Sequence, residues 1–284
     1  MNAVILGYGV VGKGIEILAK ALDDINIKYV YVRKEKENLP YFSNDEDMVV
    51  QDDIDIVFEC LNGLEPANTL IQKALKKGKH VISSNKAVVA TYLDTYLELE
   101  EEYGGSIQVE ACVAGGIPFI DALLKLKRLE PLQGYEGIFN GTSNYILDSM
   151  QKNNLDFEDV LKEAQDKGYA EKDPSNDIDG VDVYYKTKIS NSLAFNTPIV
   201  DIPYYAGIRT IKMLDIKFIK MNNKVIRHLS ISRQIDDKII SIIAPCCMDE
   251  NDFLANVPSN YNAQKILSHS FDTLGYYGQG AGKL

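Results

Sequence analysis

The stretch GYGVVGKG at residues 7–14 decides the fold of this chain. The apolar run NAVIL precedes it at residues 2–6, and IEILAKAL follows at 15–22 with its apolar residues at helical spacing. A second strand-like run, IKYVYV, lies at 27–32. Glycines between a strand and a helix permit a tight turn and let a pyrophosphate approach the helix amino end. The pattern predicts dinucleotide binding, and a glycine turn that merely packs a helix on a strand is the alternative.

Strand and helix patterns alternate after this turn and predict a doubly wound, Rossmann-type parallel sheet over residues 1–113. A helix is expected from about Pro66 to the Lys76-Lys77-Gly78 stop, and another over TYLDTYLELEEEY. We expect residues 114–284 to form a second, α+β domain for substrate binding, catalysis and dimerisation. The strand-like runs of the first domain are DIDIVFECL (53–61), HVIS (80–83) and SIQVEACV (106–113).

The second domain begins with the glycine-proline passage AGGIPFI at 114–120, which could be a rigid hinge or could turn carbonyl oxygens towards a monovalent cation. A helix is predicted over LDFEDVLKEAQDKG, with Asp156 as its N-cap and Gly168 as its stop. The runs VIRHLSISRQ and KIISIIAP predict two antiparallel strands joined at residues 235–237. We expect the tail YYGQGAGKL to be a glycine-rich loop that approaches a cofactor.

An acidic stretch, GYAEKDPSNDIDGVDVYYKTKI at 168–189, runs from a loop into a helix. Asp182 precedes Lys186 by four residues, so the two lie on one helix face in the favourable order. This pair could poise a lysine as a proton donor, with Glu171 holding the ammonium group of a substrate. The alternative is an ordinary capped helix with a surface ion pair worth about 0.2–0.5 kcal/mol. The acids of the stretch are Glu171, Asp173, Asp177, Asp179 and Asp182.

Other single residues are candidates for less specific reasons. Lys86 follows the carboxyl end of a predicted parallel strand, where ligands sit in open α/β sheets. Thr142 or Ser143 could cap the helix after IFNG, or Thr142 could bind a polar substrate. Arg33 and Lys34 end the second strand, where an arginine suits the 2′-phosphate of NADP, so we favour NADP over NAD.

Composition excludes several classes of protein. The chain has 284 residues and a net charge of −11, so it lacks the basic face that a nucleic-acid partner requires. No run approaches the length of a membrane span, and no signal peptide is visible, so we expect a cytoplasmic protein. The three histidines are scattered, and His228 is expected to serve packing. The four cysteines, expected to be reduced and buried, are Cys60, Cys112, Cys246 and Cys247.

Six blocks of the sequence, in order from residue 4 to residue 282, resemble those of the homoserine dehydrogenase family. They are GYGVVG, SSNKAVVA, EACVAGGIPF, FNGTSNYIL, GYAEKDPSNDIDGVDVYYKTKI and GQGAGK. The resemblance implies NAD(P)-dependent interconversion of L-homoserine and L-aspartate 4-semialdehyde, in the branch of aspartate metabolism that leads to threonine, methionine and isoleucine. It also implies a homodimer. NADP is the expected cofactor, with NAD possible and a sodium ion as a further ligand.

The resemblance also assigns roles to residues. Lys186 would be the acid-base group, Asp182 would orient the substrate, and Glu171 would bind its amine. Lys86 would reach both cofactor and substrate. Asp177 and Thr142 would add substrate contacts, and Glu110, Val113, Gly115 and Ile117 would hold sodium. The remaining cofactor residues would be Gly7, Tyr8, Gly9, Val10, Val11, Gly12, Cys60, Leu61, Asn62, Ser84, Gly168 and Gly280.

The family continues beyond the GAG loop with a helix that returns to the nucleotide domain, whereas this sequence stops at Leu284. We therefore expect either a fragment or compromised activity. A truncated relative that binds NADP(H) without turnover is one alternative, and a dehydrogenase for another short amino-acid aldehyde is a second. The chemistry itself needs a hydride and a proton donor and no covalent nucleophile, which separates it from aldehyde dehydrogenases that use an activated cysteine.

Overall fold

The structure is a computed structural model that describes residues 1–32 and 41–280. The chain divides into two compact units, one formed by Met1–Cys112 and one that begins at Val113. Each unit has its own sheet, so each is described by itself.

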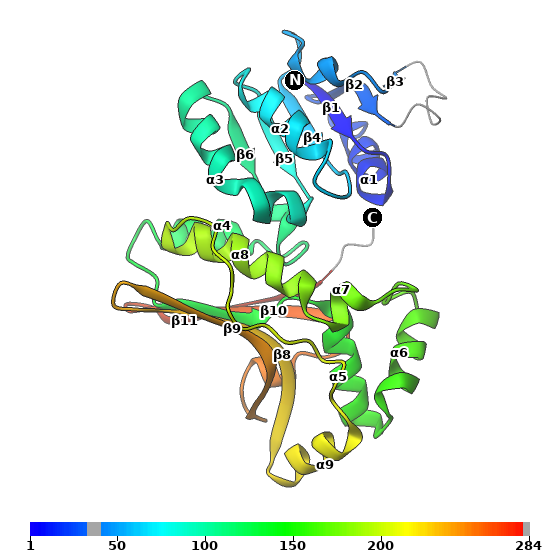
Figure 1. Ribbon diagram of the computed structural model, residues 1–284, viewed down its shortest axis with the longest axis vertical. Helices are drawn as coiled ribbons and strands as arrows, with labels where there is room; N and C mark the ends of the chain where they lie inside the picture. Colours follow the sequence, from blue (N-terminus) through cyan, green and yellow to red (C-terminus); the bar gives the residue numbers. More distant parts are fainter. Residues whose placement is uncertain (33–40, 281–284) are drawn as a thin grey trace. The chain divides into compact units, whose positions relative to one another are not determined.

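The first unit is a six-stranded parallel sheet with the strand order β3-β2-β1-β4-β5-β6 (Figure 1). This is the order of the doubly wound dinucleotide-binding fold, so the predicted fold class is confirmed. Its strands are β1 (Asn2–Leu6), β2 (Asn26–Tyr31), β3 (Phe42–Ser43), β4 (Ile56–Glu59), β5 (His80–Ser83) and β6 (Ser106–Gln108). Its helices are α1 (Val10–Ala19), α2 (Ala67–Leu75) and α3 (Lys86–Tyr103), with 3-10 turns at Glu46–Val50 and Glu110–Cys112.

The last strand of this sheet is shorter than the sequence predicts. β6 ends at Gln108, whereas the alternating pattern predicts a strand over residues 106–113. A 3-10 turn follows at Glu110–Cys112, and Ala114 and Gly115 then both have positive φ angles. An extended strand cannot continue through such a turn, and periodicity alone does not reveal where it stops.

The second unit is a five-stranded antiparallel sheet with the order β11-β10-β7-β8-β9 and several helices (Figure 1). Its strands are β7 (Gly134–Ile138), β8 (Lys224–Ile235), β9 (Lys238–Asp249), β10 (Tyr261–Ser268) and β11 (Asp272–Gln279). Its helices are α4 (Phe119–Leu126), α5 (Gly141–Asn153), α6 (Phe157–Asp166), α7 (Ser175–Ile178), α8 (Val181–Phe195) and α9 (Met213–Met221), with a 3-10 turn at Leu254–Asn256.

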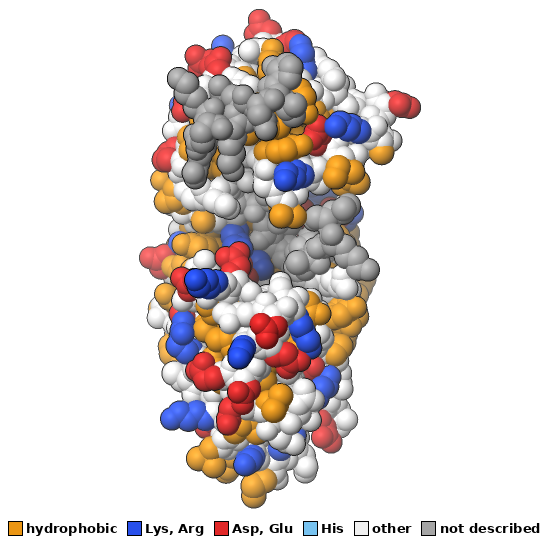
Figure 2. All heavy atoms as spheres, turned by 90° about the vertical axis from the view of Figure 1, so that its right-hand side faces the viewer, with side chains coloured by type: hydrophobic (Ala, Val, Ile, Leu, Met, Phe, Trp, Pro, Cys, Tyr) orange, Lys and Arg blue, Asp and Glu red, His pale blue; other side chains and the backbone are white. Residues whose placement is uncertain are grey.

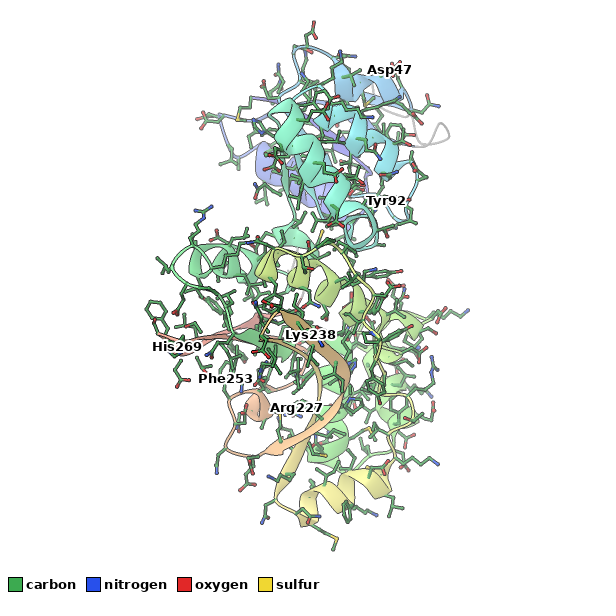
Figure 3. All side chains as sticks on the ribbon, turned by 60° about the vertical axis from the view of Figure 1, so that its left-hand side comes forward. Asp47, Tyr92, Arg227, Lys238, Phe253 and His269 are labelled. Carbon is green, nitrogen blue, oxygen red and sulfur yellow. The ribbon has the colours of Figure 1, made fainter. Side chains whose placement is uncertain are left out.

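The hairpin of β8 and β9 is confirmed, with Asp236 and Asp237 in its turn and Lys238 at the start of the returning strand (Figure 3). The predicted loop at the tail is wrong in part, because Tyr276–Gln279 belong to β11. Strands β7 and β10 were not predicted. Both contain glycine or polar residues at positions that would be apolar in an ordinary half-buried strand.

The buried contact between α8 and the sheet is polar, which explains why these strands are hard to recognise. The hydroxyl of Tyr135 on β7 donates to the Asn191 side chain (2.8 Å) and to the Thr187 carbonyl oxygen (3.1 Å) on α8. The Thr187 hydroxyl in turn forms a hydrogen bond with the Ser230 hydroxyl on β8 (2.8 Å). Directional hydrogen bonds therefore fix the rotation of α8 on the sheet.

The cysteines and histidines agree with expectation in part. All four cysteines are free, but Cys247 is exposed, because it follows half-buried Cys246 and neighbouring residues of a strand point to opposite faces. His228 is fully buried, and its ring nitrogens lie 2.9 Å from the Ala206 carbonyl oxygen and 3.3 Å from the Ser143 hydroxyl. His269 lies in the turn between β10 and β11 (Figure 3).

The surface shows mixed charge and one apolar helix side. Figure 2 shows acidic and basic side chains interspersed over one face of the second unit. Hydrophobic side chains gather at the lower end of this view, where α9 lies, and Leu214, Phe218 and Met221 of α9 are exposed. No helix among the described residues is both long enough and apolar enough to cross a membrane.

Candidate active site

The glycine turn of the first unit has the backbone geometry that its sequence predicts. Gly7 has a φ angle of 96°, and a Cβ on Gly12 would lie 2.1 Å from the carbonyl oxygen of Gly7. Only glycine therefore fits at these two positions. Helix α1 begins at Val10, and its N-cap Gly9 has no side chain to occupy the first N–H groups. Those donors are left for an anion such as a pyrophosphate.

A cavity of about 350 Å³ opens beside this turn, at the carboxyl ends of β1, β2 and β4. It brings together six residues predicted to contact the cofactor, although they come from two distant segments of the sequence. Tyr31, Val32, Glu65 and Pro66, which are not among the predicted cofactor contacts, complete the wall. The six predicted residues are Gly7, Tyr8, Gly9, Cys60, Leu61 and Asn62. The donor set, backbone N–H groups beside a cavity at a parallel sheet edge, fits a dinucleotide.

Tyr8 within the turn is held by a carboxylate from α1. Its hydroxyl donates to Glu16, which also accepts from the Tyr41 hydroxyl at 3.0 Å and pairs with Lys20 at 2.9 Å. The hydrogen bond to Glu16 raises the pKa of Tyr8 to about 12, so this phenol stays protonated. The side chain therefore keeps one orientation at the mouth of the turn.

Glu59, the last residue of β4, is a site residue that the sequence analysis missed. Its carboxylate is fully buried and accepts from the Leu61 N–H (2.8 Å), the Ser83 hydroxyl (2.6 Å) and the Asn85 side chain (3.4 Å). Burial raises its pKa. The carboxylate joins the loop after β4 to the loop after β5. The available signal was a lone acid at the end of an otherwise apolar buried strand.

The loop after β5 delivers Lys86 to the same sheet edge. Asn85 is the N-cap of α3, because its side-chain oxygen accepts from the Val88 N–H (3.3 Å), and Lys86 is the first residue of that helix. Lys86 is half-buried. The Ser84 N–H and hydroxyl both lie within hydrogen-bond distance of the Glu59 carbonyl oxygen. Ser84 and Lys86, both predicted site residues, therefore lie at the sheet edge that carries the cavity.

The acid–lysine cluster of the second unit is built from α7, α8 and the end of β7. The Lys186 ammonium donates to Asp182 Oδ2 (2.7 Å) and to the Phe139 carbonyl oxygen (2.7 Å). The Lys186 side chain is 11% exposed and that of Asp182 is 4% exposed. The predicted pair exists, and the surface alternative is wrong, since the pair is almost entirely buried. A buried pair of this kind holds its geometry through the added hydrogen bonds.

Asn140 links this pair to a second acid, and the sequence analysis missed it. Its side-chain nitrogen donates to Asp177 Oδ1 (2.7 Å) and to Asp182 Oδ2 (2.9 Å), and its oxygen accepts from the Ser143 N–H (2.8 Å). Asn140 is thus the N-cap of α5, which corrects the expectation that Thr142 or Ser143 caps this helix. Burial is the main cause that raises the pKa of Asp177. An asparagine before a glycine was the available signal.

The other predicted substrate residues lie less centrally. Thr142 is buried, and its hydroxyl donates to the Tyr169 carbonyl oxygen (2.7 Å), which ties α5 to the loop that begins at Gly168. Gly168 is exposed with a φ angle of 76°, as the stop of α6 requires. The carboxylate of Glu171 is exposed. Asp156 is the N-cap of α6 as predicted, although its side chain makes no capping hydrogen bond.

Three further sets of predicted residues stay predictions. Arg33 and Lys34 lie outside the described residues. Gly280 ends the described chain, and a Cβ on it would lie 2.6 Å from Oδ1 of the buried Asn262. The residues predicted to hold sodium, Glu110, Val113, Gly115 and Ile117, are close in sequence to Cys112, where the first unit ends. Within residues 1–32 and 41–280, no group of three or more His, Cys, Asp or Glu residues is placed to hold a metal ion.

A parallel sheet with a glycine turn and a separate unit with a buried acid–lysine cluster define the class of the NAD(P)-dependent oxidoreductases. The sequence model described as "Homoserine dehydrogenase, NAD binding domain" matches residues 7–110, and the one described as "Homoserine dehydrogenase" matches residues 118–284. This chain belongs to the homoserine dehydrogenase family.

Individual relatives agree. A homoserine dehydrogenase from Lactococcus lactis is 32% identical over 100% of this chain and 71% of its own length. One from Neisseria gonorrhoeae is 38% identical over 84% of this chain, and the match covers 55% of that relative. The crystal structure of a homoserine dehydrogenase from Thiobacillus denitrificans has a TM-score of 0.92 at 34% identity, covering 99% of this chain and 69% of that one. A hyperthermophilic archaeal homoserine dehydrogenase solved in complex with NADPH has a TM-score of 0.83 at 25% identity, covering 99% of this chain and 92% of that one.

Proposed function

We propose that this chain catalyses the NAD(P)-dependent interconversion of L-homoserine and L-aspartate 4-semialdehyde. The observation that supports this best is the Lys186 ammonium group, which is nearly buried and held by Asp182 and by the Phe139 carbonyl oxygen. An ammonium has three N–H donors, so two fixed acceptors leave one donor for a substrate oxygen.

The first unit would hold the cofactor. The N–H groups at the start of α1 would bind the pyrophosphate, and the cavity wall at Cys60, Leu61 and Asn62 would contact the nicotinamide half. When bound, the nicotinamide exchanges a hydride with the carbon that carries the substrate oxygen. Lys86, at the same sheet edge, would contact both cofactor and substrate.

Lys186 would handle the proton. In the reducing direction it would donate a proton to the aldehyde oxygen as negative charge develops there, and in the oxidising direction it would accept the hydroxyl proton. Asp182 holds the ammonium in place by its charge and its hydrogen bond. Cys60 at the cavity does not suit nucleophilic catalysis, because burial raises its pKa to about 12. The Cys112 thiol donates instead to the Ser83 carbonyl oxygen (3.1 Å).

Acids of the second unit would recognise an amino-acid substrate. Asp177 and Glu171 offer carboxylates to the substrate amine, and Thr142 offers its hydroxyl at the same end of α5. A carboxylate that accepts a charge-assisted hydrogen bond discriminates strongly against a substrate analogue that lacks the amine. This supports homoserine over simple alcohols.

Cofactor preference, sodium and pathway are parts of the same proposal. The basic pair Arg33 and Lys34 favours NADP, and NAD remains the alternative cofactor. Sodium would be bound by the Glu110 side chain and by backbone carbonyls of Val113, Gly115 and Ile117. The place in metabolism would be the cytoplasmic branch that leads to threonine and methionine.

The open side of the second sheet supports a homodimer. Ile240 and Ile242 of β9 and Tyr277 of β11 are 56%, 37% and 50% exposed, respectively. Ile240 and Ile242 share one face with Ile231 of β8, since Ile231 pairs with Ile242, and the register through β10 and β7 places Tyr277 on the same face. Exposed apolar residues aligned on a sheet face are typical of an interface between protein copies. Sedimentation of the purified protein would test this, and a monomer at micromolar concentration would contradict it.

The test of the activity uses purified protein with L-homoserine and NADP at alkaline pH. We expect reduced nicotinamide to accumulate and to be consumed again on addition of aspartate semialdehyde. NADP(H) binding without turnover would favour the second candidate, a relative that binds cofactor only. A homoserine analogue without the amine serves as the control, and equal turnover of both would contradict the proposed substrate.

A further inference from the structure

The side-chain nitrogen of Asn140 makes two hydrogen bonds that the capping of α5 does not explain. It follows β7 directly, and its carboxamide is divided between two tasks. Its oxygen caps α5 through the Ser143 N–H (2.8 Å), while its nitrogen donates to Asp177 (2.7 Å) and Asp182 (2.9 Å). A capping asparagine is ordinary, but capping uses only its side-chain oxygen, so the cap does not account for the bonds of the nitrogen. This one is 5% exposed, and both of its N–H groups point to carboxylates.

The bonds of Asn140 converge on the oxygen that also holds the lysine. Asp182 Oδ2 accepts from Asn140 Nδ2 and from Lys186 Nζ. Lys186 is bound in addition by the carbonyl oxygen of Phe139, the residue before Asn140. Two neighbouring residues at the end of β7 therefore fix both ends of the ion pair. Two of the three ammonium donors are used in this way, and the direction of the third follows from them.

We propose that Asn140 is a positioning residue for Lys186, which separates the two acids at the cluster and sets the orientation of the ammonium group. The inference rests on the proposed proton-transfer role of Lys186. Without the carboxamide, Asp177 and Asp182 would face each other across the space that it fills, and one of the two would take up a proton or turn away. The lysine would then lose its fixed partner.

The charges that face Lys186 come from three elements. Asp182 belongs to its own helix, Asp177 comes from α7, and His228 comes from β8 close to Asp182. Burial lowers the pKa of His228 to about 4, so the ring is neutral near pH 7 and the two acids determine the local field. A third carboxylate in place of Asn140 would therefore stabilise the charged ammonium group.

Two substitutions separate the capping task from the positioning task. Asn140→Asp and Asn140→Ser both keep an N-cap oxygen for α5, and both remove the carboxamide nitrogen that donates to the two acids. Asn140→Asp also adds a negative charge. In Asn140→Asp we expect the pH midpoint of homoserine oxidation to rise by about one unit and kcat to fall at least tenfold. Asn140→Ser should lower kcat with a smaller shift of the midpoint.

Asn176→Asp is the matched control, because Asn176 is exposed on α7 beside Asp177 and the same charge is added there without entering the cluster. It should leave the pH midpoint within about 0.3 units, since an exposed charge is screened. The inference would be overturned by an unshifted midpoint in Asn140→Asp, or by rates that fall only in proportion to the folded fraction measured by circular dichroism. The second result would make Asn140 a helix cap and nothing more.

A second readout does not depend on turnover. The rate at which an amine-specific reagent modifies Lys186, followed by peptide mapping, reports the fraction of neutral amine at each pH. Asn140→Asp should move this profile to higher pH relative to Asn176→Asp. If the wild-type protein were inactive with homoserine, this shift would still support the positioning role, and its absence would still contradict it.

Discussion

The two units contain the same arrangement of side chains, but the buried carboxylate has different partners in each. In each, an asparagine caps a helix with its oxygen and holds a buried carboxylate with its nitrogen: Asn85 with Glu59 in the first unit, and Asn140 with Asp182 in the second. Glu59 accepts from a backbone N–H, a hydroxyl and a carboxamide, all neutral. Asp182 accepts from Asn140 and from the Lys186 ammonium. The comparison separates a carboxylate that joins two loops from one that holds the ammonium group proposed to transfer a proton.

The negative charges of Glu59 and Asp182 make different contributions. Burial without a charged donor raises the pKa of Glu59, so its ionised form costs folding energy. At Asp182 the charge has a cationic partner and a fixed geometry. Removing the charge should therefore damage function in the second unit and spare the first.

The largest expected difference concerns Asp182→Asn. The asparagine keeps the shape and an oxygen that can accept from Lys186 and Asn140, but it removes the negative charge that holds the ammonium group, so we expect kcat for homoserine oxidation to fall by about 10²-fold or more. Cofactor affinity should stay within about threefold, because Asp182 belongs to the other unit. Steady-state kinetics and a fluorescence titration with NADPH would measure both. A kcat near the wild-type value would contradict the claim that the charge of Asp182 is needed for activity.

A second prediction concerns the pH dependence of stability, which should differ between the two units. His228 is neutral when folded, because burial lowers its pKa from 6.5 to about 4. The unfolded chain binds this proton more readily, so the stability that the neutral ring allows is present above about pH 6.5 and is lost as the pH falls towards 4. Between pH 7 and pH 5 the loss is about 2 kcal/mol.

Hydrogen exchange of β8 amides would measure this loss in the second unit. His228→Gln should remove most of the pH dependence, whereas His269→Gln in the β10–β11 turn should retain it. A second unit whose protection is equal at pH 7 and pH 5 in the wild type would contradict the neutral state of His228. Glu59 should act in the opposite sense, because a carboxyl with a raised pKa gains stability as the pH falls.

The smallest expected effect is that of Glu59→Gln. The glutamine oxygen can still accept from the Leu61 N–H, and its nitrogen can donate to the Ser83 hydroxyl. We expect kcat within about threefold of wild type and a melting temperature that is unchanged or higher, since a buried charge is removed and the Leu61 N–H and the Asn85 side chain keep an acceptor. Glu59→Ala is the control that leaves those donors unpaired, and it should lower the melting temperature. A large loss of kcat in Glu59→Gln would mean that its charge, too, is functional.

Much of the fold could be predicted because its signals are local. The glycine turn, the βαβ unit and the helix stops depend on residues close in sequence. At Gly7 and Gly12 the surrounding backbone leaves no room for a side chain, so the sequence has glycine there. β7 and β10 could not be predicted, since their buried positions carry polar side chains such as Gln264, and they pair with each other across more than a hundred residues of sequence.

The candidate site divides in the same way. The pair of Asp182 and Lys186 could be predicted from helical spacing, and its burial could not. Asn140 and Glu59 matter because of what the fold places against them, and a single asparagine or glutamate in a sequence carries no such information. The hydrogen bond from the Thr142 hydroxyl to the Tyr169 carbonyl oxygen is likewise a contact that the sequence does not reveal.

The central claim is that the ammonium of Lys186 transfers the proton while the other unit holds the cofactor. Lys186→Ala tests it most directly, with turnover of L-homoserine and binding of NADPH measured on the same preparation. The account predicts a loss of turnover of about 10³-fold or more with an NADPH dissociation constant within about threefold of wild type. A variant that oxidises homoserine at close to the wild-type rate would contradict it.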